Sequence, residues 1–138
     1  MSIREKIGKS LQDLISDDID WDEIQHITKV DPEKFDPEAY SEEHKEALYD
    51  TDAIMISGSD GVTAENTSET LKALEDLDKV TIQEPYRSSH VSEENVLKFN
   101  YIGVPSVING NSKHLLGKHV DFYSKFPDQI EEARNKAA

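Results

Sequence analysis

The stretch that decides the fold is AIMISGSDGVT, residues 53–63. It opens with an unbroken apolar run over residues 53–56, which is typical of a strand buried on both faces. A polar segment with two glycines follows, and Thr63 is placed to cap a helix that begins after it. A buried strand, a glycine-containing turn and a capped helix in succession predict one βα unit of an α/β fold.

Three more apolar segments share this organisation. They cover residues 24–30, residues 80–83, and residues 101–105 with a continuation to 108. Four segments with helical spacing follow the strands. The first covers residues 41–49, and the second begins after Thr63 and carries Leu71, Leu74 and Leu77. The third begins at Ser92, and the fourth covers residues 113–123. An amphipathic helix is expected over residues 3–16, and a solvent-exposed helix over residues 128–138. Strands alternating with helices indicate a parallel sheet with right-handed crossovers.

The composition limits the classes of protein to which this chain can belong. Acidic residues number 29 against 15 basic ones, which gives a formal net charge of -14 over 138 residues. Such a charge repels nucleic-acid backbones, which need a basic footprint. The chain has no cysteine and no apolar stretch long enough for a membrane span, and its amino terminus is charged. We therefore expect a cytoplasmic protein. The surplus acid predicts a solvated surface, as in proteins from salt-rich cytoplasm.

Two candidate residues lie at the carboxyl end of the first strand. Alternation places Lys29 and Asp31 on the same side of that strand, at its carboxyl end. In parallel α/β folds functional groups gather at these ends. A lysine beside a carboxylate suits a magnesium-bound phosphate, because the carboxylate binds the metal and the ammonium binds an oxygen. The alternative is a salt bridge at the strand end.

The ends of the second and third strands offer further candidates. Glycines in residues 57–63 let the backbone approach a ligand, and successive N–H groups there can bind an anion near the start of a helix. The spacing matches neither a Walker A loop nor a dinucleotide fingerprint, so a tight turn before a capped helix is the alternative. Glu84, held by Pro85, is either an inward-facing base or charge stabiliser, or a solvated loop acid. The five histidines lack zinc-ligand spacing.

Taken together, four blocks in this order resemble the geranylgeranylglyceryl and heptaprenylglyceryl phosphate synthases. The blocks are HITKVDPEK at residues 26–34, TDAIMISGSDGVT at residues 51–63, VPSVIN at residues 104–109 and LLGKHV at residues 115–120. The resemblance implies the N-terminal (βα)4 half of a TIM (β/α)8 barrel with a leading helix. It also implies one partial domain over residues 1–138, with βα units from about residue 22.

The resemblance implies an activity and a site. The family performs a Mg²⁺-dependent prenyl transfer of archaeal-type ether-lipid biosynthesis, from a geranylgeranyl-type diphosphate to the hydroxyl of sn-glycerol 1-phosphate. By this resemblance Asp31 and Ser59 bind the metal, and Lys29 binds the substrate. Ser57 is a departure, because the family usually has glycine there. The family's later Tyr-x-Glu-Tyr-Ser-Gly segment is also absent.

These departures lead to the expectation that the chain alone is inactive, as a fragment of a synthase. A variant of this interpretation has two copies associate as a homo-oligomer, since a half-sheet exposes unpaired edges. The alternative from a different class is a non-catalytic α/β module that binds Mg²⁺ and a phosphorylated ligand through the same residues. A phospho-receiver domain fits less well, because the paired acids and later lysine of that class are not evident.

Overall fold

Four parallel strands form the centre of the molecule. The computed structural model describes residues 22–103 and 117–136. The strands are β1 (Ile27–Val30), β2 (Ala53–Ile56), β3 (Val80–Gln83) and β4 (Tyr101–Ile102), and they lie in the order β1-β2-β3-β4. Every neighbouring pair is parallel. The predicted α/β class with a parallel sheet is therefore confirmed.

Helices connect and flank these strands. The described helices are α2 (Glu42–Tyr49), α3 (Ala64–Leu74), α4 (Lys118–Lys125) and α5 (Pro127–Lys136). A 3-10 turn, η1 (Glu75–Leu77), extends α3, and a second one, η2 (Ser88–His90), follows β3. Thr63 caps α3 as predicted, with its hydroxyl accepting a hydrogen bond from the Asn66 N–H at 3.1 Å. The predicted helix over residues 3–16 and the continuation of β4 to residue 108 lie outside the described residues.

The helix predicted from Ser92 is wrong. Residues 93–98 form turns instead. Ser92 and Asn95 bond each other's backbone N–H groups through their side chains, at 3.2 Å in both directions. The Asn95 amide then donates to Ser68 on α3 at 2.6 Å. The same reciprocal pair of bonds joins Thr63 and Asn66 at the start of α3, so it does not by itself prevent a helix. At Ser92 the Asn95 side chain is also bonded to α3, and residues 93–98 continue only as turns.

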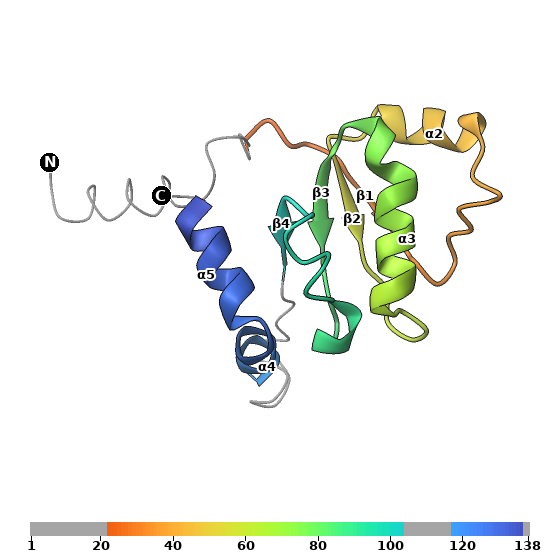
Figure 1. The fold of residues 1–138 in the computed structure, drawn as a ribbon. Helices are drawn as coiled ribbons and strands as arrows, with labels where there is room; N and C mark the ends of the chain where they lie inside the picture. Colours follow the sequence, from red (N-terminus) through yellow and green to blue (C-terminus); the bar gives the residue numbers. More distant parts are fainter. Residues whose placement is uncertain (1–21, 104–116, 137–138) are drawn as a thin grey trace, which may run out of the picture.

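One face of the sheet packs against helices. Ile54 and Ile56 of β2 join leucines from α2, α3 and η1 in a buried cluster. Its members are Leu48, Ile54, Ile56, Leu71, Leu74, Leu77 and Phe99. Figure 1 shows α3 lying alongside the first strands, with α4 and α5 beyond β4. The leucines predicted to form a stripe therefore do cover the sheet.

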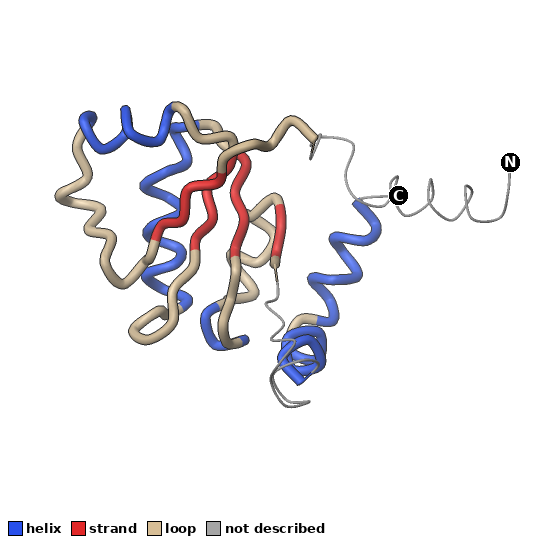
Figure 2. Tube along the Cα trace, turned by 180° about the vertical axis from the view of Figure 1, so that it is seen from behind, coloured by secondary structure: helices blue, strands red, loops and turns tan. Residues whose placement is uncertain are grey.

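The opposite face carries the alternate residues of each strand. The register aligns Lys29 with Met55, and Met55 with Ile82. Aligned residues of parallel strands point to the same face, so all three point away from the leucine cluster. Figure 2 views the molecule from this side, with the strands in front of α3. Within the described ranges, no helix is long and apolar enough to cross a membrane.

Candidate functional site

A cavity of about 200 Å³ lies where β1, β2 and β3 end. The backbone keeps these ends in line, because the Ser57 N–H donates to Val30 O at 3.0 Å and the Glu84 N–H to Ile56 O at 3.1 Å. The cavity is lined by Lys29, Asp31, Ser57, Gly58, Ser59, Glu84 and Tyr86. The structure thus brings the sequence-predicted residues Lys29, Asp31 and Ser59 to one place.

Asp31 is held by the turn that follows β1. Its backbone oxygen accepts the Lys34 and Phe35 N–H groups, both at 3.0 Å. Its carboxylate accepts the Glu33 N–H at 3.1 Å through Oδ1, and Oδ2 lies 3.3 Å from the Lys34 ammonium. The salt bridge considered for Lys29 and Asp31 is replaced by two others, since Asp31 pairs with Lys34 and Lys29 with Glu84.

The loop after β2 packs directly on Asp31. A Cβ atom at Gly58 would overlap Oδ1 of Asp31 and a methyl group of Val62. Gly61 has a φ of 73°, in the left-handed region that glycine tolerates best. The Asn66 side chain fixes this loop to α3 by donating to Gly61 O at 2.9 Å. Gly58 therefore allows the loop backbone to approach the Asp31 carboxylate closely, whereas the predicted approach to a ligand stays a prediction.

Glu84 lines the cavity, which agrees with the inward-facing position that was one of its two alternatives. Its Oε2 atom accepts a hydrogen bond from the Ser57 hydroxyl at 2.7 Å and lies 4.0 Å from the Lys29 ammonium. Ser57 itself is buried, with 5% of its surface exposed. Sequence reasoning missed the Ser57–Glu84 bond and the presence of Tyr86. Pro85 was the available signal, since it fixes how the chain leaves β3.

The oxygen atoms in the cavity suit a magnesium ion. The carboxylate of Asp31 and the exposed hydroxyl of Ser59 are hard ligands, and the glycine loop leaves the Asp31 carboxylate at the cavity wall. The described residues contain no group of three or more His, Cys, Asp or Glu side chains that could hold a metal. Magnesium commonly binds through one or two carboxylates together with water and substrate phosphates, so this sparse set of ligands fits that ion.

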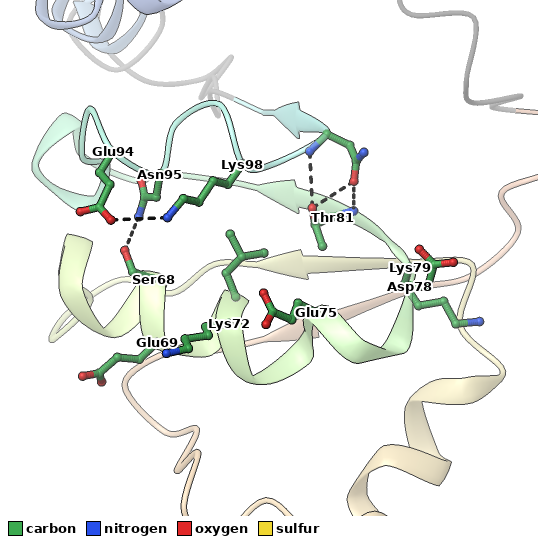
Figure 3. A pocket seen from close by; sticks show the side chains of 12 residues that line it. Ser68, Glu69, Lys72, Glu75, Asp78, Lys79, Thr81, Glu94, Asn95 and Lys98 are labelled. Carbon is green, nitrogen blue, oxygen red and sulfur yellow. Dashed lines mark hydrogen bonds and ion pairs between the residues drawn. The ribbon is translucent and has the colours of Figure 1, made fainter.

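A larger cavity of about 720 Å³ lies elsewhere, between α3 and residues 94–100 (Figure 3). It reaches the amino end of β3 at Lys79 and Thr81, whereas the candidate site lies at the carboxyl ends of the strands. Its charged lining is mixed, with four acids and three lysines, namely Glu69, Glu75, Asp78, Glu94, Lys72, Lys79 and Lys98. Its Lys98 and Glu94 pair with each other at 3.5 Å. Position at the carboxyl ends of the strands favours the smaller cavity as the functional site.

The fold and the smaller cavity define an α/β protein with a lysine and oxygen ligands at the carboxyl ends of its parallel strands. A profile of the PcrB family matches residues 19–136. The chain therefore belongs to the PcrB family, as the sequence resemblance predicted.

Curated relatives agree with this family. The geranylgeranylglyceryl phosphate synthase of Methanocella arvoryzae is 33% identical over 115 residues, which cover 81% of this chain and 47% of the relative. That of Methanosphaerula palustris is 36% identical over 100 residues, covering 72% and 42%. The heptaprenylglyceryl phosphate synthase of Bacillus cytotoxicus is 32% identical over 107 residues, covering 75% and 43%. The chain thus spans less than half the length of these relatives.

Proposed function

We propose that this chain carries the diphosphate-binding end of a magnesium-dependent prenyltransferase. The observation that supports the proposal most is the convergence of Lys29, Asp31 and Ser59 on one cavity at the strand ends. The names of the relatives indicate the substrates, a prenyl diphosphate and glycerol phosphate. The fold proposed for the whole protein is a (β/α)8 barrel, of which this chain, with its leading helix, forms the N-terminal half.

Each residue of the cavity has a proposed role. Asp31 and Ser59 would hold a magnesium ion, which supplies charge neutralisation for the diphosphate leaving group. Lys29 binds a phosphate oxygen of the diphosphate through its ammonium group. In the reaction the bond between the prenyl carbon and the diphosphate oxygen breaks. The diphosphate leaves with the electron pair of the broken bond. A new bond forms from the prenyl carbon to the hydroxyl oxygen of glycerol 1-phosphate, and the hydroxyl proton passes to solvent water.

The first test is binding of inorganic pyrophosphate to the purified chain by titration calorimetry. Wild-type protein is expected to bind in the presence of magnesium and to lose most of this affinity when the metal is removed with a chelator. Asp31→Asn is expected to abolish the magnesium dependence. Lys29→Met is expected to weaken binding by about tenfold or more, because it removes a charge-assisted hydrogen bond.

A matched control uses an ion pair outside the cavity. Glu94→Gln and Lys98→Met likewise replace an acid by its amide and a lysine by methionine, here in an exposed pair, and are expected to leave pyrophosphate binding unchanged. Equal affinity in wild type, Asp31→Asn and Lys29→Met would contradict the proposed site.

A non-catalytic module that binds magnesium and a phosphorylated ligand is the second candidate. It relies on the same groups of the described cavity as the enzyme proposal. Radiolabelled ether product from geranylgeranyl diphosphate and glycerol 1-phosphate would establish the enzyme and exclude the module. Pyrophosphate binding without product does not separate the two, because the N-terminal half of an enzyme is itself expected to be inactive alone.

A further inference from the structure

Three side chains from three neighbouring strand ends form a row across the cavity. Ser57, the first residue after β2, donates its hydroxyl to Oε2 of Glu84, the first residue after β3, at 2.7 Å. The same oxygen lies 4.0 Å from the Nζ atom of Lys29 on β1. All three lie on the face of the sheet opposite the leucine cluster. One carboxylate oxygen therefore faces both a buried hydroxyl and the lysine ammonium.

The three side chains differ in how exposed they are. Ser57 is buried and its backbone N–H is bonded to β1, so its hydroxyl is a fixed donor. Glu84 is intermediate, with 32% of its side chain exposed, and Pro85 restricts the backbone after it. Lys29 has 57% of its side chain exposed and four rotatable bonds. An exposed lysine loses considerable rotamer freedom on binding a ligand, unless a neighbour already holds it.

We propose that Glu84 is a positioning residue for Lys29, and that Ser57 fixes the Glu84 carboxylate for this purpose. The proposal rests on the phosphate-binding role of Lys29 given above. Ser57 holds the carboxylate through Oε2, and the carboxylate keeps the Lys29 ammonium on the cavity side of β1. An incoming diphosphate then meets an ammonium group that is already in place.

The charge of Glu84 makes this proposal testable by the sign of an effect. A carboxylate beside an anion site repels the anion, so removing its charge should tighten binding if charge were its whole effect. Positioning acts through Lys29 and predicts the opposite result. Glu84→Gln is therefore expected to weaken pyrophosphate binding in the presence of magnesium by about threefold, a value suited to a partly exposed ion pair.

A double-mutant cycle tests whether the effect passes through Lys29. We expect Glu84→Gln to weaken binding about threefold when Lys29 is present and to have no such effect in Lys29→Met protein. Ser57→Ala should reproduce the behaviour of Glu84→Gln in both backgrounds, and Glu94→Gln is the matched control. Tighter binding of Glu84→Gln, or equal weakening in both backgrounds, would overturn the proposal.

A measurement without ligand keeps this proposal separate from the proposed function. The ammonium ¹⁵N–¹H signal of Lys29, assigned with Lys29→Met, is expected to shift in Glu84→Gln and in Ser57→Ala but not in Glu94→Gln. If wild-type protein does not bind pyrophosphate, the proposed function fails while this measurement still decides the contact. A Lys29 signal that is unchanged in both Glu84→Gln and Ser57→Ala would disprove the positioning role.

Discussion

At the scale of single residues, the candidate site depends on the absence of a side chain at position 58. The Asp31 carboxylate occupies the space that a Cβ atom of residue 58 would need. The φ angle of Gly58 is not in the left-handed region, since Gly61 is the glycine with a positive φ among the described residues. The requirement at Gly58 is therefore one of space, and a Cβ atom there would overlap both Asp31 and Val62.

The first prediction at this scale concerns Gly58→Ala. We expect it to lower the free energy of unfolding by about 1–3 kcal/mol, the usual cost of forcing an extra methyl group into a packed site. Because it displaces the proposed metal ligand, it should also weaken magnesium-dependent pyrophosphate binding by more than this stability loss explains. Urea unfolding and calorimetry measure the two effects.

Gly103→Ala is the matched control for this substitution. A Cβ atom there would meet its nearest neighbours, Ile82 and Gln83, at 3.9 and 4.0 Å, which is ordinary contact. It is expected to leave pyrophosphate binding unchanged. Normal magnesium-dependent binding by folded Gly58→Ala protein would argue against the placement of Asp31 in the site.

The sequence predicted which residues enter the cavity better than it predicted their partners. Alternation along β1 places Lys29 and Asp31 on one side, and this is what the cavity requires. It does not identify which acid pairs with Lys29, because that depends on the register of β3 against β2. Glu84 reaches Lys29 only because the ladder continues one residue beyond each strand, at Ser57 and Glu84.

At the scale of secondary-structure elements, the connection between β3 and β4 has no described α-helix. It is held by buried polar contacts and by a small apolar cluster with α4. The Gln83 side chain donates to His90 O at 3.0 Å, and Asn95 binds Ser68 on α3. Val91 and Val96 pack with Phe122 and Phe126. These contacts replace the helix that the sequence pattern predicted from Ser92.

The prediction at this scale concerns His90, which is 4% exposed. Burial lowers the pKa of His90, and the nearby charge of Arg87 lowers it further. Below about pH 6.5 the unfolded histidine binds a proton that folded His90 does not yet bind. The free energy of unfolding therefore decreases as the pH is lowered through this window. The loss stops once the pH lies below the pKa of folded His90.

His90→Gln isolates this contribution from that of the many carboxyl groups. The stability of wild type relative to His90→Gln is expected to be constant above about pH 7.5 and to decrease as the pH falls through about 6.5. Urea unfolding across this range measures both proteins. Parallel stability curves for the two proteins would show that His90 does not contribute in this way.

The strands were predicted more reliably than the connections for a physical reason. Residues 53–56 and 80–83 are strands in both the prediction and the structure. The first is an unbroken run of apolar residues, and the second opens with three β-branched residues, Val80, Thr81 and Ile82; both patterns favour a strand. The segment from Ser92 has helical spacing, and its Ser92–Asn95 bonds repeat the pattern that begins α3, yet residues 93–98 are turns. The Asn95 side chain there is bonded to Ser68, and this bond depends on the tertiary position of α3, which spacing along the chain does not contain.

At the scale of the whole molecule, acidic charge is the dominant property. The chain carries 29 acidic and 15 basic residues, for a formal net charge of -14 at pH 7. Several basic side chains already pair with acids, among them Lys45, which joins α2 to η1 by pairing with Glu42 and Asp76. The excess acids therefore repel one another, and this repulsion opposes the compact state more than the expanded one.

The last prediction follows from screening of this repulsion. Raising sodium chloride from about 0.05 M to about 1 M shortens the screening length from above 10 Å to about 3 Å, so the thermal midpoint at pH 7 should rise by several degrees. The same salt change at about pH 4.5, where many carboxyl groups are protonated, should raise the midpoint far less. Circular dichroism melts at both pH values provide the comparison, and the pH contrast separates screening from general salting-out, which acts at either pH. An equal rise at both pH values would mean that the salt acts on apolar surface, and that the acidic surface imposes little cost on this fold.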